Sequence, residues 1–258
     1  MNKKLSFGKR NLPLAIVYFV YVSDKFPEPK SLCMKTFFVG IALCIPAAFL
    51  NTYFIWDQPN PYDYIYLAGL TEESLKFLAL YIFVKRQLEF NEPMDALVYS
   101  VAASIGFAVY ENWEYVISGS EVSLKFAKDI ALIRAFSAVP LHALTGVFMG
   151  FFLIEAIFDK INKKLFLFLA LFFPICLHGL YNLILSSNNF STYWIYILLI
   201  VFIIRAYFVF KKERNLQKFQ NNRFSKTIPT HSDIIFSIFV SGFILFSFNY
   251  FVNFVLYQ

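Results

Sequence analysis

Charged residues are scarce in this 258-residue chain: Asp, Glu, Lys and Arg make up 16% of it, whereas hydrophobic residues make up 59%. A water-soluble domain usually contains about 25% charged residues, so this composition excludes an ordinary soluble protein. Glycine is also scarce, at nine residues, and the alternation of polar and apolar residues that marks barrel strands is missing. An all-α fold is therefore expected.

The chain has only three cysteines, Cys33, Cys44 and Cys176, and each lies in or beside an apolar stretch. Their odd number and spacing indicate neither a disulfide framework nor a thiolate metal site. The net charge of +6 arises mostly from Lys and Arg in short loops, where such residues orient membrane proteins. We therefore expect the lipid bilayer, and no nucleic acid, as a partner.

Long apolar runs are abundant, and the mean hydropathy is +0.58. A helix needs about 20 mostly apolar residues to cross a bilayer. We expect eight helices, at about 11–23, 32–54, 62–84, 94–118, 130–158, 165–185, 192–210 and 233–257. The sequence thus predicts a polytopic integral membrane protein with about eight transmembrane helices, or seven if the short first one does not span. We expect one membrane domain over 1–258.

The loops predict the orientation of this domain in the membrane. Those at 24–31, 85–93, 159–164 and 211–232 together contain 13 Lys and Arg residues, against six in the opposite loops and the N-terminal tail. Because Lys and Arg collect on the cytoplasmic side, the 13-residue face is expected there. The segment 211–232 is then a basic cytoplasmic loop, and the N-terminus lies outside if the first helix spans.

Three ionisable residues, Glu72, Glu73 and Lys76, lie in the middle of one apolar run. Placing one such side chain near the centre of a membrane helix costs roughly 2.5–3.5 kcal/mol of insertion free energy, so three together indicate a functional or structural role. Glu72 precedes Lys76 by four residues, which is the favourable order for an ion pair on a helix. We expect this pair to support the helix and Glu73 to transfer protons. The alternative is a purely structural ion pair between helices.

Glu111, His142 and His178 each lie in one of the next three apolar runs. At 1.5 Å per residue, they and Glu73 fall within roughly 8 Å of one another along the membrane normal, in its outer half. Ionisable groups at a similar depth on four helices indicate one composite site. A single buried histidine would more often be a hydrogen-bonded core residue.

Neighbouring residues are expected to support this site. Gly146, one turn after His142, permits close approach of another helix, and Pro140 bends the helix by removing a backbone hydrogen bond. Asn182 lies on the same helix face as His178 and is expected to orient it. The motif-bearing core is therefore 62–185.

Arg134 lies near the start of the fifth expected helix. Its long side chain is expected to reach outward to the membrane interface, or to pair with Glu121 or Asp129. It is therefore left out of the expected site.

Buried carboxylates and imidazoles suit hydrolysis, ion transport or structural packing. For hydrolysis, Glu73 would take a proton from water while His142 and His178 stabilise the oxyanion. Alternatively, His142, His178 and Glu111 would hold zinc, with another glutamate as base. No His-Glu-x-x-His signature decides between a zinc enzyme and a metal-free one. A proton- or ion-coupled transporter would use the same groups as a relay, but it commonly has inverted repeats, which this sequence lacks.

Four motifs occur in order on successive helices: Glu72-Glu73-x-x-Lys76, Phe107-x-x-x-Glu111, His142-x-x-x-Gly146 and His178. In this order they resemble the PrsW family of intramembrane proteases, which is related to the CAAX-processing and bacteriocin-immunity proteases. The resemblance extends over about residues 12–185. The last expected helix and the basic loop add nothing to it.

The resemblance implies an intramembrane protease in the plasma membrane of a bacterium. It implies site-1 cleavage of a single-span membrane protein, such as an anti-sigma factor, near the outer face. Glu72, Glu73, Glu111, His142 and His178 match the family's functional positions. PrsW proteins are often labelled metalloproteases, whereas the related CAAX enzyme is argued to be glutamate-based, so zinc and no metal both stay open. Some members serve bacteriocin resistance instead.

Overall fold

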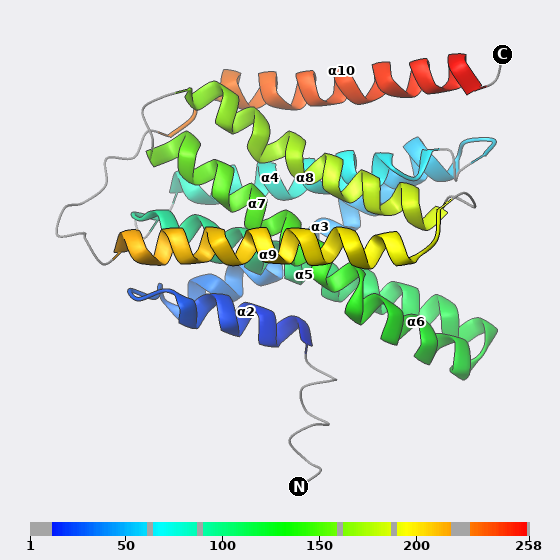
Figure 1. Ribbon diagram of the computed structural model, residues 1–258, viewed down its shortest axis with the longest axis horizontal. Coiled ribbons are helices and arrows are strands. Elements are labelled where there is room, and N and C mark those ends of the chain that lie inside the picture. Colours follow the sequence, from blue (N-terminus) through cyan, green and yellow to red (C-terminus); the bar gives the residue numbers. More distant parts are fainter. Residues whose placement is uncertain are drawn as a thin grey trace, which may run out of the picture.

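The computed structural model describes residues 12–60, 64–86, 90–158, 162–186, 190–217 and 228–256 (Figure 1). All regular elements among these residues are helices, which confirms the all-α class. They are α2 (Leu12–Ser23), α3 (Lys30–Asn51), the π-helix η1 (Thr52–Trp56), α4 (Leu67–Arg86), α5 (Pro93–Val122), α6 (Leu124–Phe136), α7 (Ala138–Phe158), α8 (Lys163–Ser186), α9 (Tyr193–Leu216) and α10 (His231–Leu256).

Five helical segments within the described residues are long and apolar enough to cross a membrane. They are Lys30–Trp56, Pro93–Val122, Leu124–Phe158, Lys163–Ser186 and Tyr193–Leu216. The apolar part of α2 is shorter, and α4 carries several charged residues along its length. The protein is therefore a multi-pass membrane protein, and the count of eight spans stays a prediction.

Helix α5 is the centre of the bundle. It packs against α2, α3, α6 and α7, and 89% of its most apolar window is buried. In Figure 1, α2 and α10 lie at opposite edges of the bundle. Because other helices enclose the first half of α5, its polar residues Asp95, Ser100 and Ser104 lie inside the protein and do not face lipid.

Small residues allow the helices around α5 to approach it closely. A Cβ atom on Gly106 of α5 would lie 1.9 Å from the carbonyl oxygen of Phe37 on α3. Gly146 makes the close approach that the sequence predicts, because a Cβ there would lie 2.9 Å from the carbonyl oxygen of Ser100 on α5. Small residues have this role in membrane bundles, where close packing stabilises helix pairs.

The helix expected at 130–158 is wrong as a single element. The structure divides it at Ser137 into α6 and α7, and α6 begins earlier, at Leu124. Pro140 lies in the first turn of α7 and has no N–H to donate to the carbonyl of Phe136, so the helix cannot continue unbroken. The break redirects α6, which lies beside the end of α5 (Figure 1).

The expected loop at 211–232 is partly wrong, because α9 continues to Leu216 and α10 begins at His231. The last helical residues of α9 are polar and basic, so the helix extends past the apolar run that defined its expected end. Residues 218–227 of the expected loop lie outside the described residues.

Candidate active site

Lys76 pairs with Glu73, so the expected pair with Glu72 is wrong. Its Nζ lies 2.8 Å from Glu73 Oε1, and both side chains are fully buried. The same ammonium donates to Nδ1 of His142 on α7, at 3.0 Å. Lys76 pairs with the glutamate three residues before it, and not with the one four residues before it, because its side chain points to the side of α4 where Glu73 and His142 lie.

Glu73 also holds His178. The Nδ1 of His178 on α8 donates to Glu73 Oε1 at 2.9 Å. One carboxylate oxygen therefore joins Lys76 and His178, which ties α4 to α8. A hydrogen bond of this kind fixes the ring orientation of a histidine and leaves its other nitrogen, Nε2, for a further partner.

Glu111 forms a second ion pair, which is partly buried. Its Oε2 lies 2.8 Å from a guanidinium nitrogen of Arg134 and 2.9 Å from Nε2 of His142. Since Lys76 donates to Nδ1 of His142, Nε2 carries the ring proton and donates to Glu111. The expectation that Arg134 reaches outward or pairs elsewhere is wrong, because the break before α7 places α6 beside α5.

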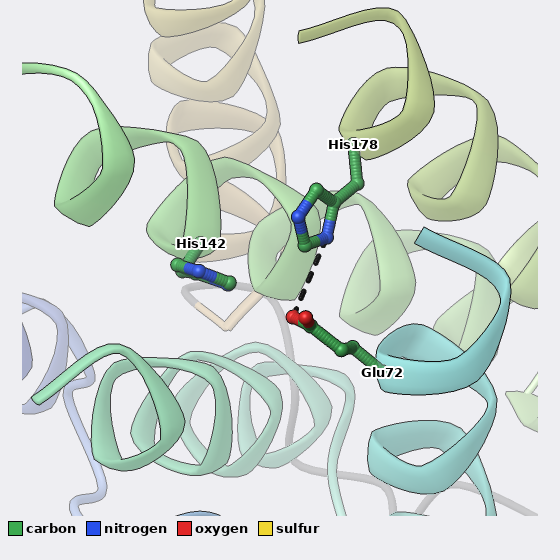
Figure 2. Close-up of side chains that lie close together, drawn as sticks. All are labelled: Glu72, His142 and His178. Carbon is green, nitrogen blue, oxygen red and sulfur yellow. Dashed lines mark ion pairs between the residues drawn. The ribbon is translucent and has the colours of Figure 1, made fainter. Parts of the chain in front are cut away.

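Among the described residues, Glu72 has no cationic partner at hydrogen-bonding distance. Its Oε1 accepts from the amide of Asn51 at 3.2 Å, while its buried Oε2 has no hydrogen-bond partner among the described residues. The nearest ring nitrogen, Nδ1 of His178, lies 3.9 Å from Oε2. Figure 2 shows the Glu72 carboxylate pointing between the rings of His142 and His178. Those two rings contact edge to face, with centroids 5.1 Å apart.

The charges of these groups do not balance. Lys76 neutralises Glu73, and Arg134 neutralises Glu111. Within the described parts of the chain, Glu72 is then a carboxylate without a counter-charge, and only 4% of its surface is exposed. A buried carboxylate is costly without a counter-charge, so this site favours binding of a cation or a proton at Glu72.

A cavity of about 390 Å³ adjoins these groups. Glu72, Glu111, His142 and His178 line it, and so does the exposed Trp56. Glu73 does not line the cavity and is fully buried behind it. Water or a substrate in the cavity would therefore meet Glu72 and not Glu73.

Two further side chains differ from expectation. Asn182 also lines the cavity, but its amide donates to the carbonyl of Ile65 at 3.3 Å and not to His178. Asn51, which the sequence did not single out, holds Glu72. The sequence feature that could have indicated Asn51 is its amide at the end of an apolar helix, and this feature is too common to indicate a site.

The donor set fits a zinc ion. One ligand atom each from Glu72, His142 and His178 lies within 4.8 Å of the others, and two imidazoles with a carboxylate are a common zinc set. Two further observations fit zinc: Glu72 Oε2 lacks a partner among the residues that the structure describes, and His178 donates a hydrogen bond to Glu73. Both nitrogens of His142 already have partners, so an ion would displace one of them. Glu111, expected as the carboxylate ligand, is engaged by Arg134.

A buried carboxylate between two imidazoles, beside a cavity in a membrane bundle, has the groups that an intramembrane hydrolase needs to accept a proton from water and to stabilise an oxyanion. Residues 28–207 match the family described as PrsW family intramembrane metalloprotease. The chain belongs to the PrsW family, as its four motifs predict.

Relatives named Protease PrsW support this assignment. The one from Bacillus subtilis (strain 168) is 32% identical over 209 residues, which are 78% of this chain and 90% of the relative. The one from Shouchella clausii is 32% identical over 178 residues, covering 67% of this chain and 80% of the relative. No solved structure matches significantly. The protein is thus an intramembrane protease.

Proposed function

We propose that the protein hydrolyses a peptide bond of a membrane-anchored protein at the cavity wall formed by Glu72, His142 and His178. The observation that carries this proposal is Glu72 Oε2, which has no hydrogen-bond partner in the described part of the chain and lies between two imidazoles beside the cavity. Hydrolysis needs a group to accept a proton from water and donors for the developing oxyanion, and these three side chains supply both.

Glu72, rather than Glu73, is the proton acceptor in this proposal. Glu72 lines the cavity and has an oxygen available for a water molecule. Glu73 instead binds Lys76 and His178 and so positions the second imidazole. The roles expected for Glu72 and Glu73 are thus exchanged, because Lys76 pairs with Glu73, three residues before it, and not with Glu72.

His178 is the donor for the negative charge that develops on the carbonyl oxygen of the scissile bond, and the N–H of His142 would have to leave Glu111 to donate there as well. His178 can direct its Nε2 toward the cavity, because Nδ1 is bound to Glu73. His142 is held between Lys76 and Glu111, and Arg134 holds Glu111 in turn. The ammonium of Lys76, 3.0 Å from His142, adds positive potential to this wall.

If the enzyme uses zinc, Glu72, His142 and His178 would hold it. A bound zinc ion polarises a carbonyl and lowers the pKa of water, which is the chemistry it would supply. Glu111 and Glu114, which line the same cavity, would then be the remaining carboxylates near the substrate. Glu72 is required in either case, as ligand or as base.

The substrate class follows from the face of the bundle on which the cavity lies. Trp56, which lines it, belongs to the face opposite the loops rich in Lys and Arg, which we propose is the outer face of a bacterial plasma membrane. A single-span protein such as an anti-sigma factor would present a peptide bond at this depth. The segment must unwind there, because a helical backbone leaves no carbonyl accessible to the site.

The proposal is tested with purified protein and a tagged single-span anti-sigma factor in the same liposomes. We expect the native protein to cut the substrate and His178→Ala to lose at least about 100-fold in rate. The matched control is Glu121→Gln, an exposed carboxylate on α5, which should cut at the native rate. Equal cutting by His178→Ala would refute the site.

A chelator measures the role of metal in the same assay. If zinc is required, dialysis against a zinc chelator stops cleavage, zinc restores it, and the protein contains about one zinc per chain. If Glu72 acts as base without metal, cleavage continues and no zinc is found. Glu72→Gln is inactive in both cases.

A further inference from the structure

A second cluster of carboxylates lies away from the active site. Asp24 follows α2, Glu92 precedes α5, and Asp95 lies in the first turn of α5. One carboxylate oxygen of each lies within 4.8 Å of the others. Asp95 is 16 residues before Glu111 on one helix, which is about 24 Å along its axis. The cluster is therefore separate from the active site.

Two oxygens in this cluster, Asp24 Oδ2 and Asp95 Oδ1, are buried and have no hydrogen-bond partner within the described parts of the chain. Asp95 is fully buried and Asp24 is 6% exposed. The other oxygen of Asp95 accepts the backbone N–H groups of Asn91 and Glu92, at 2.9 and 2.8 Å. One oxygen thus caps α5, while the second, which a cap does not need, is left for a ligand.

Gln217 at the end of α9 holds the cluster together. Its Nε2 donates to Asp24 Oδ1 and to Glu92 Oε1, both at 2.8 Å. A neutral amide bridges two carboxylates without cancelling their charge. The bridge therefore keeps the acids close together while leaving their repulsion in place.

The described residues supply this cluster with no counter-charge. Among them, Asp24, Glu92 and Asp95 form no ion pair with Lys or Arg. Burial and the nearby charges of Asp24 and Glu28 raise the pKa of the Glu92 carboxyl to about 7. Close carboxylates without a cation repel one another, and buried ones do so more strongly.

We propose that Asp24, Glu92 and Asp95 bind a hard divalent cation, Ca²⁺ or Mg²⁺, which joins the connection between α2 and α3 to the start of α5. Such ions bind carboxylate oxygens, and the set contains no imidazole or thiolate that would favour zinc. The cation would offset most of the negative charge of the cluster and fix the start of α5, which carries Glu111 further along. Positive-inside charge places this site on the cytoplasmic face.

Calorimetric titration of the full-length protein in detergent, first stripped with EDTA, tests this proposal with CaCl₂ and MgCl₂. We expect one Ca²⁺ or Mg²⁺ per chain. Asp95→Asn should weaken binding at least about tenfold, because one charged ligand is lost. Glu72→Gln should leave it unchanged. The matched control, Asp57→Asn, alters an exposed carboxylate and should also bind as the native protein does.

Thermal unfolding separates a ligand from a structural carboxylate. In EDTA, Asp95→Asn should be at least as stable as the native protein, because it removes a repelling charge and keeps an acceptor for the cap. Added Ca²⁺ should raise the Tm of the native protein and not that of the variant. Asp24→Asn gives the same comparison if Asp95→Asn does not fold. Absence of binding by the native protein at millimolar cation, or equal binding by Asp95→Asn, would overturn the proposal.

Discussion

At the scale of one residue, Lys76 compensates one of the buried carboxylates of the active site, Glu73. Its ammonium is fully buried and contacts Glu73, His142 and the ring of Phe107, whose centroid lies 4.2 Å away. Removing one partner of a buried ion pair leaves an uncompensated charge, which costs about 3–5 kcal/mol. Lys76 and Glu73 are therefore expected to stabilise the fold as well as the site.

The adjacent glutamates should differ in their effect on stability. Glu73→Gln should lower the free energy of unfolding by about 3–5 kcal/mol, because Lys76 loses its carboxylate. Glu72→Gln should cost far less, because Glu72 has no close cationic pair among the described residues and the amide can still contact Asn51. Thermal unfolding of the two variants in detergent measures this difference. Equal destabilisation would contradict the assigned pairing.

Arg134 should matter for activity through its hold on Glu111. Arg134→Gln should lower the cleavage rate about 10- to 100-fold, because Glu111 then loses its cation and holds His142 less firmly. A lysine side chain at this position could restore the charge but not the planar contact with Asn112 and Glu111, so Arg134→Lys should recover only part of the rate. Native rates in Arg134→Gln would show that Glu111 needs no such support.

Depth along the helix predicted which residues meet, but not how they pair. The 1.5 Å rise per residue brought Glu72, Glu73, Glu111, His142 and His178 to one level, and the structure brings all five together. The rotation of each helix, which selects Glu73 for Lys76 and Glu72 for the cavity, depends on packing by neighbours. Sequence spacing does not contain that information.

At the scale of elements, the break between α6 and α7 explains why Arg134 was missed. A continuous helix over 130–158 carries Arg134 away from the site, toward the interface. The proline in the first turn of α7 interrupts the backbone hydrogen bonds of the helix near Ser137, and α6 then packs on α5. A proline predicts a bend, but its direction is set by the contacts that follow.

The contact between α5 and α7 should tolerate no side chain at Gly146. Gly146→Val should destabilise the protein by about 1–3 kcal/mol and lower activity, because its Cβ would lie 2.9 Å from the Ser100 carbonyl oxygen. Gly242 of α10 is the matched control, because a Cβ there meets nothing within 4 Å among the described residues. Thermal unfolding of Gly146→Val and Gly242→Val measures the contrast. Equal loss in both would mean that the close approach is unimportant.

At the scale of the whole molecule, the number of spans and the orientation depend on charge. Helix α4 is rich in charge for an apolar run, yet it lies inside the bundle with Glu73 and Lys76 fully buried. Intramembrane charges are tolerated where they pair with one another and face the protein interior. The all-helical class follows from composition and the missing strand alternation, whereas the span count requires knowing which charges are paired.

The orientation is testable with single cysteines. Asp57→Cys should react with a membrane-impermeant maleimide in intact cells, because Asp57 is exposed and follows Trp56, which lines the cavity on the expected outer face. Lys164→Cys, at a position 82% exposed on the opposite face, should react only after the cells are opened. The reverse pattern would place the cavity on the cytoplasmic side and exclude cleavage near the outer face.

The most direct test of the active site is the rate at which purified, folded Glu72→Gln cuts a single-span anti-sigma factor in liposomes. The uncompensated Glu72 carboxylate faces the cavity between His142 and His178, so its neutral amide should lower the rate at least about 100-fold. Glu121→Gln in the same preparation should keep the native rate. Cleavage by Glu72→Gln at the native rate would contradict the assignment of this carboxylate to the reaction.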